Sequence, residues 1–246
     1  MMHRFFVEPE LIARMNSGLL ALEGAIAHQV ANVLRLRVGD EITLLDNAGS
    51  EYLVWLERVE RKLVVVQMVE TKAVEGEPQT QITLYQSLLK GEKWDFVLQK
   101  CTEVGVSRIV PVVSERCVAR PAGGRQHRHL RIIQEAAEQS QRGLLPLLGD
   151  TLTFAAACEQ AVASHDLALI LWEGEPVADL GHALRQQYGS VALFVGPEGG
   201  YSAQEVTLAH QYGIIPATLG PRILRAETAG LVAAAITLYS FGDMQK

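Results

Sequence analysis

The chain has 246 residues, of which 48% are hydrophobic, and carries a formal net charge of −6 at pH 7. This length suits one large core or two modest ones, and we predict two domains. The acidic balance argues against a protein that coats nucleic acid non-specifically, because that mode of binding needs an overall basic face. The chain has no uninterrupted apolar run of roughly 18 residues and its first residues do not resemble a signal peptide, so a cytoplasmic location outside any membrane is expected.

Residues 1–72 are predicted to form a small β-rich domain. Helical spacing of Val30, Val33 and Leu34 indicates a short helix over 28–37, which Gly39 would end. Runs rich in valine, leucine and aromatic residues predict strands over 4–8, 41–46, 51–60 and 62–70. We therefore expect a short helix packed on a small barrel.

Residues 73–246 are predicted to form a second domain, after a polar linker over 71–78. Continuous apolar strands that alternate with amphipathic helices indicate a parallel sheet covered on both faces. The strands are expected over 81–87, 108–113, 166–172, 191–195 and 214–219. The helices are expected over 93–105, 128–142, 154–163 and 177–187, from Ser202 to Gly213, and from about Arg225 to Tyr239.

The cysteines Cys101, Cys117 and Cys158 are scattered through this second domain. They form no CxxC pair and have no histidines at metal-ligand spacing around them. We therefore predict reduced thiols in or near the core, and no metal site.

A basic segment covers residues 116–131. It contains five arginines and two histidines but no acidic residue. Such a patch can contact phosphates on an otherwise acidic protein. The alternative is an ordinary solvated loop and helix face.

Two Gly-Pro corners near the C-terminus each follow an apolar run and lead into a predicted helix. The first is GPEGG (196–200), and the helix after it begins with a capping box of Ser202 and Glu205. The second lies within LGPRILRAETA (219–229), and the helix after it is apolar on nearly every face, so it must be buried in a core or against a partner. Glycines beside a carboxylate let backbone approach a ligand closely, although GPEGG alone could be a simple tight turn.

These corners resemble the C-terminal signature of the RsmE family, the 16S rRNA uridine-N3 methyltransferases of the SPOUT class. The resemblance extends through residues 90–117 and 135–142 and into VLRLRVGDEITLLD (33–46). It implies an α/β protein with an N-terminal PUA-like small β-barrel that binds RNA and a C-terminal SPOUT sheet with a trefoil knot. It also implies a homodimer that transfers a methyl group from S-adenosylmethionine to N3 of a uridine in 16S rRNA of the small ribosomal subunit.

The resemblance carries over to individual residues. Arg142 and Arg225 are expected to polarise the uracil, whose N3 proton must be lost, and Glu198 to orient groups or handle the proton. Arg142 could instead be a helix C-terminal charge, and Glu198 could cap neighbouring amides. The expected cofactor contacts are Leu171, Trp172, Glu173, Gly196, Pro197, Glu198, Gly199, Gly200, Leu219, Gly220, Arg222, Leu224, Arg225, Glu227 and Thr228. The expected RNA contacts are Arg35, Arg37, Lys90, Lys93, Arg116, Arg120, Arg125 and Arg128.

Parts of the sequence also fit other functions. A SPOUT methyltransferase could act on another RNA or another base position. A non-catalytic RNA-binding module is disfavoured because both ligand-facing corners are intact. A nicotinamide oxidoreductase is disfavoured because the G-x-G-x-x-G fingerprint is missing.

Overall fold

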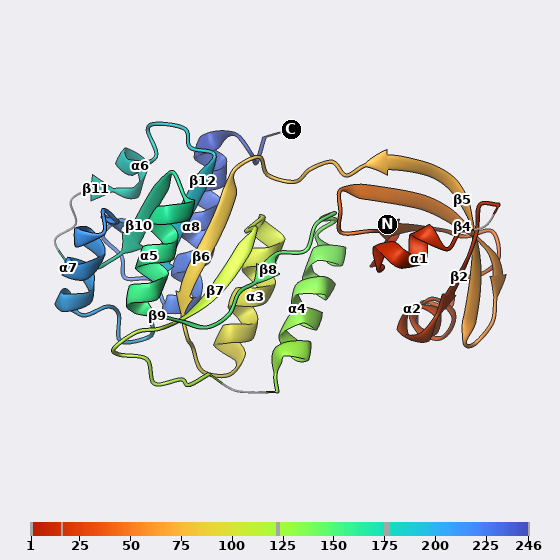
Figure 1. Ribbon diagram of the computed structural model, residues 1–246, viewed down its shortest axis with the longest axis horizontal. Coiled ribbons are helices and arrows are strands. Elements are labelled where there is room, and N and C mark those ends of the chain that lie inside the picture. Colours follow the sequence, from red (N-terminus) through yellow and green to blue (C-terminus); the bar gives the residue numbers. More distant parts are fainter. Residues whose placement is uncertain (1, 16, 122–123, 175–177, 246) are drawn as a thin grey trace. The chain divides into compact units, whose positions relative to one another are not determined.

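The computed structural model describes residues 2–15, 17–121, 124–174 and 178–245, which divide into two compact units (Figure 1). The first unit comprises residues 1–77 with 137–145, and the second comprises 78–136 with 146–246. The sequence predicts a boundary after residue 72 and gives no sign that 137–145 pack with the first unit. Within the described ranges, no helix is both long and apolar enough to cross a membrane.

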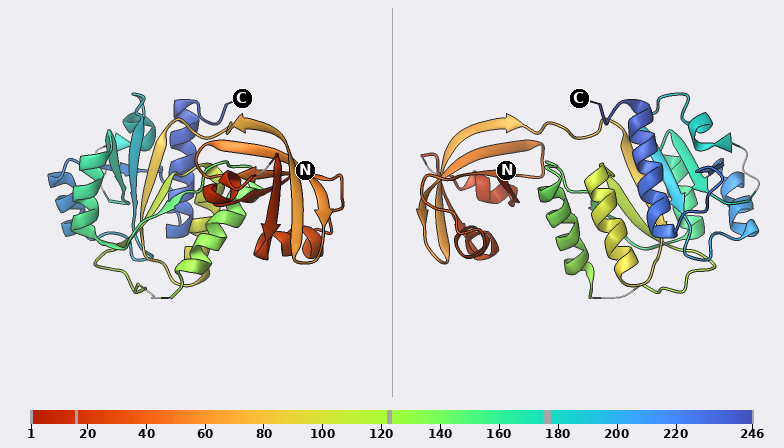
Figure 2. Two further views of the ribbon diagram at one scale, coloured as in Figure 1. Left: turned by 45° about the vertical axis from the view of Figure 1, so that its right-hand side comes forward. Right: turned by 180° about the vertical axis from the view of Figure 1, so that it is seen from behind.

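The first unit is built on a mixed sheet, which has five strands as far as this unit is described (Figure 2). The strand order is β1-β3-β4-β5-β2, with β1 and β3 parallel and the other pairs antiparallel. The predicted strands are confirmed, whereas the short β2 was not expected. The bounds are β1 (His3–Phe6), β2 (Leu19–Glu23), β3 (Glu41–Leu45), β4 (Ser50–Val59) and β5 (Leu63–Ala73).

The helical part of the first unit differs from the prediction of one helix over 28–37. Helix α2 (Gly24–His28) begins earlier and continues as a π-type turn over Gln29–Val33. Arg35 has a φ of 55°, in the left-handed region, so the helix must end before it. A further short helix, α1 (Pro9–Ala13), begins at a proline, whose missing N–H costs nothing in a first turn.

The second unit contains a sheet whose strand pairs, among the described residues, are all parallel. The order is β11-β13-β10-β12-β6-β7-β8, and β9 also pairs with β7. The five predicted strands are confirmed, and the others are too short to give a sequence pattern. The bounds are β6 (Gln81–Ser87), β7 (Arg108–Val113), β8 (Leu147–Leu148), β9 (Leu152–Thr153), β10 (Leu167–Leu171), β11 (Ala178–Asp179), β12 (Ser190–Val195) and β13 (Ile215–Thr218).

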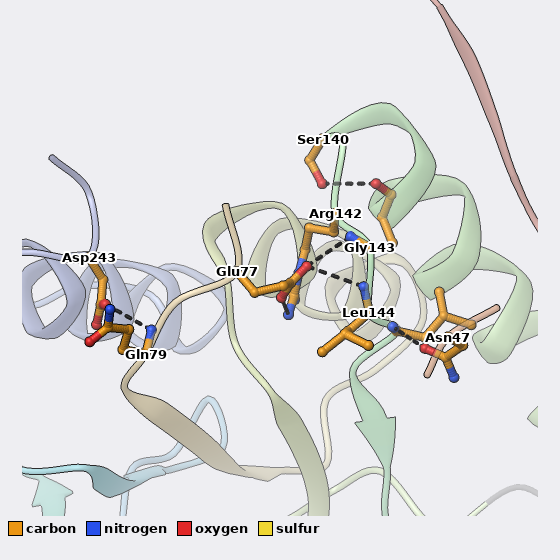
Figure 3. Close-up of polar contacts among 10 residues, drawn as sticks. Asn47, Glu77, Gln79, Ser140, Arg142, Gly143, Leu144 and Asp243 are labelled. Carbon is orange, nitrogen blue, oxygen red and sulfur yellow. Dashed lines mark hydrogen bonds and ion pairs between the residues drawn. The ribbon is translucent and has the colours of Figure 1, made fainter. Parts of the chain in front are cut away.

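Helices cover both faces of this sheet, as predicted (Figures 1 and 2). Neighbouring strand residues point to opposite faces, so Leu193 belongs to a core cluster with residues of α3, α4, α6 and α8, while Phe194 belongs to a second cluster with residues of α5 and α7. Just after the C-terminal end of α8, Asp243 accepts a hydrogen bond from the N–H of Gln79, which lies shortly before β6 (Figure 3). The bounds are α3 (Glu92–Val104), α4 (Gln126–Gln139), α5 (Phe154–Ser164), α6 (Leu180–Ala183), α7 (Ala203–Gln211) and α8 (Ala226–Phe241).

Two helix predictions were wrong in extent. The helix expected over 177–187 is only the single turn α6, preceded by the short strand β11, and Val177 lies outside the described residues. The carboxylate of Asp179 caps α6 by accepting from the N–H of His182, which fixes its start at Leu180, three residues later than expected. Helix α4 ends at Gln139, so Arg142 lies beyond it.

The three cysteines are buried, as predicted. Burial raises the pKa of Cys101 and of Cys158 to about 12, so both are protonated thiols at neutral pH.

We expect the folded protein to react slowly with a thiol reagent such as 5,5′-dithiobis(2-nitrobenzoate) at pH 8. The protein unfolded in guanidinium should react fully, because only unfolding exposes these thiols and restores their ordinary acidity. Rapid reaction of Cys101 or Cys158 in the folded protein would contradict the packing described above.

Candidate active site

Three loops at the carboxyl ends of neighbouring strands enclose a cleft of about 560 Å³ in the second unit. The loops follow β13, β10 and β12, which are adjacent in that order. Ligands of open parallel sheets bind at this edge. The residues predicted to contact the cofactor line the cleft, with the exception of Thr228. Thr228 lies in the first turn of α8, where its N–H donates to the carbonyl of Arg225 at 2.9 Å.

The loop after β12 depends on glycine for its tight shape. A Cβ on Gly196 would lie 3.1 Å from the backbone carbonyl carbon of Gly200, so a side chain would require the backbone of the loop to shift. Gly200 itself has a φ of 64° and donates its N–H to the carbonyl of Pro197. Beyond the loop, the capping box of Ser202 and Glu205 is confirmed and starts α7. The loop therefore offers backbone groups to the cleft.

Side chains from earlier in the second unit hold this loop. Arg116 Nη1 donates to the carbonyl of Gly199 at 2.9 Å, and Lys93 Nζ lies 3.1 Å from Glu198 Oε1. Both cations also line the cleft, although the sequence predicts them as RNA contacts.

The third of these side chains is Gln86, which the sequence analysis missed. Its Nε2 donates to the carbonyls of Ser87 at 3.2 Å and Gly196 at 3.4 Å, and the side chain is fully buried. Because both partners are acceptors, the orientation of the amide is fixed. The only signal in the sequence was a polar residue within the apolar run of β6, which also fits an ordinary strand end.

Glu198 is a carboxylate rather than a carboxylic acid at neutral pH. Burial alone would raise its pKa, but its own backbone N–H and the ammonium group of Lys93 lower the pKa below the ordinary value. A lowered pKa also makes the carboxylate a weak base, so of the two roles predicted for Glu198, orientation fits better than proton handling.

The loop after β13 leads into the N-terminus of α8 at the cleft. Arg225 precedes the helix and is exposed, and Glu227 lies in its first turn. The Oε2 atom of Glu227 is buried and, among the described residues, has no hydrogen-bond partner. A buried carboxylate oxygen without a donor is costly, so this atom is suited to a ligand that brings a donor or a positive charge.

Arg142 belongs to the first unit and is not among the residues that line the cleft. Its side chain is 7% exposed, and its Nη2 lies 2.7 Å from Glu77 Oε2. The same carboxylate accepts from the N–H groups of Gly143 at 2.9 Å and Leu144 at 3.2 Å (Figure 3). The role of Arg142 toward a substrate stays a prediction, and the partner Glu77 carried no signal in the polar linker sequence.

The Arg142→Ala variant should lose about 2–4 kcal/mol of unfolding free energy, because it leaves the partly buried Glu77 carboxylate with only backbone donors. Urea denaturation followed by circular dichroism measures this loss. Arg131→Ala is the matched control, because it removes the exposed pair with Glu135 on α4 and should change stability by less than about 0.5 kcal/mol. Equal stability of the two variants would contradict a structural role for the buried pair.

The other predicted RNA contacts are exposed on both units. Arg35 and Arg37 lie after the helical turn of the first unit. In the basic segment, Arg128 pairs with Asp95, whose Oδ2 is 2.6 Å from its Nη2. The remaining predicted contacts are the exposed residues Lys90, Arg120 and Arg125. Within the basic segment, residues 122 and 123 lie outside the described ranges.

Comparison with known families and structures agrees with this architecture. Residues 75–238 match the model of an RNA methyltransferase domain, and residues 22–69 match that of an RNA methyltransferase PUA domain. A structure from Neisseria gonorrhoeae, described as a ribosomal RNA small subunit methyltransferase E bound to S-adenosylmethionine, is 34% identical with a TM-score of 0.88 and covers 97% of this chain and 98% of that one. The class is thus RNA methyltransferases with a PUA domain.

A curated relative from Synechocystis, ribosomal RNA small subunit methyltransferase E, is 35% identical over 96% of this chain and 77% of its own length. A methyltransferase structure from Legionella pneumophila with bound S-adenosylmethionine is 31% identical with a TM-score of 0.86, and the match covers 98% of each chain. This chain belongs to the ribosomal RNA small subunit methyltransferase E family. The resemblance in the sequence motifs is confirmed.

Proposed function

We propose that this chain transfers a methyl group from S-adenosylmethionine to N3 of a uridine in the 16S rRNA of the small ribosomal subunit. The observation that carries the proposal is the cleft of backbone-rich loops at the carboxyl edge of the parallel sheet. Relatives with this architecture are named as methyltransferases of small-subunit rRNA, and two solved ones hold S-adenosylmethionine. A substrate in the ribosomal subunit puts the reaction in the cytoplasm.

The cleft has the groups that such a methyl donor needs. The apolar side chains of Leu171, Leu219 and Leu224 line it beside the glycine loop, and are suited to an adenine whose edge meets backbone N–H and C=O groups. The Oε2 atom of Glu227, which has no hydrogen-bond partner in the described part of the chain, suits the positive charge of the donor. When bound, S-adenosylmethionine supplies an activated methyl group on a sulfonium.

The protein's own residues are proposed to position and polarise the uracil. N3 carries a proton near neutral pH, and losing it leaves negative charge on the ring oxygens. Arg225, exposed at the start of α8 and lining the cleft, is proposed to stabilise that charge, whereas the role proposed for Arg142 rests on its sequence motif alone. Glu198 is proposed to orient the loop through Lys93. Because base pairing hides N3, the uridine must be unpaired or flipped out.

RNA binding is proposed to involve both units. The PUA domain, whose mixed sheet we propose to be a small barrel, would contribute Arg35 and Arg37, and the second unit would contribute Lys90, Arg120 and Arg125. Phosphate contacts of this kind fix the orientation of an RNA without reading its sequence. The site of methylation would then depend on which uridine is brought to the cleft.

A homodimer and a trefoil knot are further parts of the proposal. Helix α8 is apolar on nearly every face, and its outer face leaves Ile236 36% and Tyr239 66% exposed, which suits an isologous interface. The knot is supported by the path of the chain, since β13 lies beyond β10 while the following α8 packs back on β12, β6 and α3.

The function is tested by incubating the protein with labelled S-adenosylmethionine and small ribosomal subunits from a strain that lacks the corresponding gene. We expect one labelled N3-methyluridine in 16S rRNA, identified by mass mapping. Label at another base or in another RNA would redirect the proposal to a different substrate. A protein that binds the donor but labels no RNA would leave only the cofactor site.

Glu227→Gln should bind S-adenosylmethionine about 10-fold more weakly, because it keeps the shape of the side chain but removes the charge opposite the sulfonium or amino group. Calorimetric titration of the RNA-free protein measures this. Glu159→Gln, which neutralises a carboxylate on α5 at the same cost in net charge, is the control and should bind normally. Unchanged affinity in Glu227→Gln would remove this residue from the site.

A further inference from the structure

Hydrogen bonds connect the loop after β7 to the chain at the end of the glycine loop (196–200), which follows β12. The backbone N–H of Glu115 donates to Glu205 Oε1 at 2.8 Å, and the other oxygen of Glu205 accepts from the N–H of Ser202 at 3.0 Å. The hydroxyl of Ser202 in turn donates to Glu115 Oε2 at 2.6 Å. The capping box that starts α7 is thus extended by Glu115 into a link between two loops.

Arg116, the next residue, reaches the glycine loop from the same side. Its Nη1 donates to the carbonyl of Gly199 at 2.9 Å. Its own Cβ lies 3.3 Å from the place where a Cβ on Gly199 would be, so the Arg116 backbone and side chain also limit what residue 199 can be. A charged donor on a loop carbonyl fixes the direction of that peptide plane, which also carries the Gly200 N–H that donates to the carbonyl of Pro197.

We propose that Glu115 and Arg116 are positioning residues for the cofactor loop. This proposal rests on the proposed function, because it takes the cleft to be the S-adenosylmethionine site. Glu115 anchors the end of the loop at Ser202, and Arg116 orients the peptide at Gly199. The assignment differs from the sequence prediction for Arg116, which is a phosphate contact of the basic segment.

Loss of these contacts should lower the affinity for the ligand. The loop contains glycine on both sides of Glu198, so without these contacts its backbone can adopt several conformations. When a loop samples several conformations, the apparent affinity for its ligand is reduced by the fraction of molecules in the binding-competent conformation. One hydrogen bond of this kind corresponds to roughly a 3- to 10-fold change in affinity.

The test is calorimetric titration of S-adenosylmethionine into the RNA-free protein, so that phosphate contacts cannot contribute. Arg116→Ala should bind about 3- to 10-fold more weakly, and Arg116→Lys, which keeps a charged donor, should recover part of the loss. Arg185→Ala removes one exposed cation of the same unit outside the cleft and should bind like the wild type. Glu115→Ala, which frees the Ser202 hydroxyl, should weaken binding independently, and thermal denaturation checks that each variant is folded.

Wild-type affinity in both folded variants, Arg116→Ala and Glu115→Ala, would overturn the proposal and leave Arg116 as an RNA contact only. An equal loss in Arg185→Ala would also overturn it, because the effect would then be one of net charge. If the wild-type protein itself bound no S-adenosylmethionine, the proposed function would fail and this proposal with it. Failure of the positioning role alone is therefore distinguishable from failure of the function.

Discussion

The cleft depends on the fixation of a glycine loop that has little structure of its own. Glycine lets the backbone turn back within van der Waals distance of itself between residues 196 and 200, and it also leaves that segment with more conformational entropy to lose than any other residue type would. Hydrogen bonds and an ion pair from side chains outside the loop offset this loss of conformational entropy. Gln86, Lys93 and Arg116 each bond a different loop residue.

In the second unit, local ion pairs matter more than the net charge of the whole chain, which is −6. Lys93 and Arg128 belong to the cations that the sequence marks for RNA, yet each is committed to a carboxylate. Exposed pairs are weak, and an incoming phosphate can compete for such a cation. The exposed Arg120 and Arg125 lie between Lys93 and Arg128 in the chain, so the basic segment combines residues that order the protein with residues that face solvent.

Much of the fold followed from local patterns, because those patterns record the local environment. The apolar runs predicted the five longer strands of the parallel sheet, and the capping box of Ser202 and Glu205 predicted the start of α7. The prediction of a helix over 177–187 was wrong because the helix that Asp179 caps has only one turn. This turn contains Gly181 and does not continue after Ala183. The two Gly-Pro corners lie among the residues that line the cleft.

What local patterns could not predict are partners far apart in the chain. The carboxylate of Glu77 lies in a stretch that reads as a polar linker, and the buried amide of Gln86 reads as the end of a strand. Neither residue has a characteristic spacing to its partner, since the pairing is set by how the strands and loops assemble. The burial of Arg142 against Glu77 is a fact of this kind, and so is the place of Arg116 at the cleft.

The contacts that hold the cleft also determine when it can form. Gln86 and Gly196 are separated by 110 positions, and Glu115 and Glu205 by 90. Loop closure over such distances costs entropy that is recovered only after both partners are in place, and contacts of this range form slowly. During synthesis the earlier halves of these pairs leave the ribosome long before the later ones, so the cleft is among the last features of the second unit to be assembled. Ligand binding at the cleft is therefore a sensitive report that the whole unit has reached its native state.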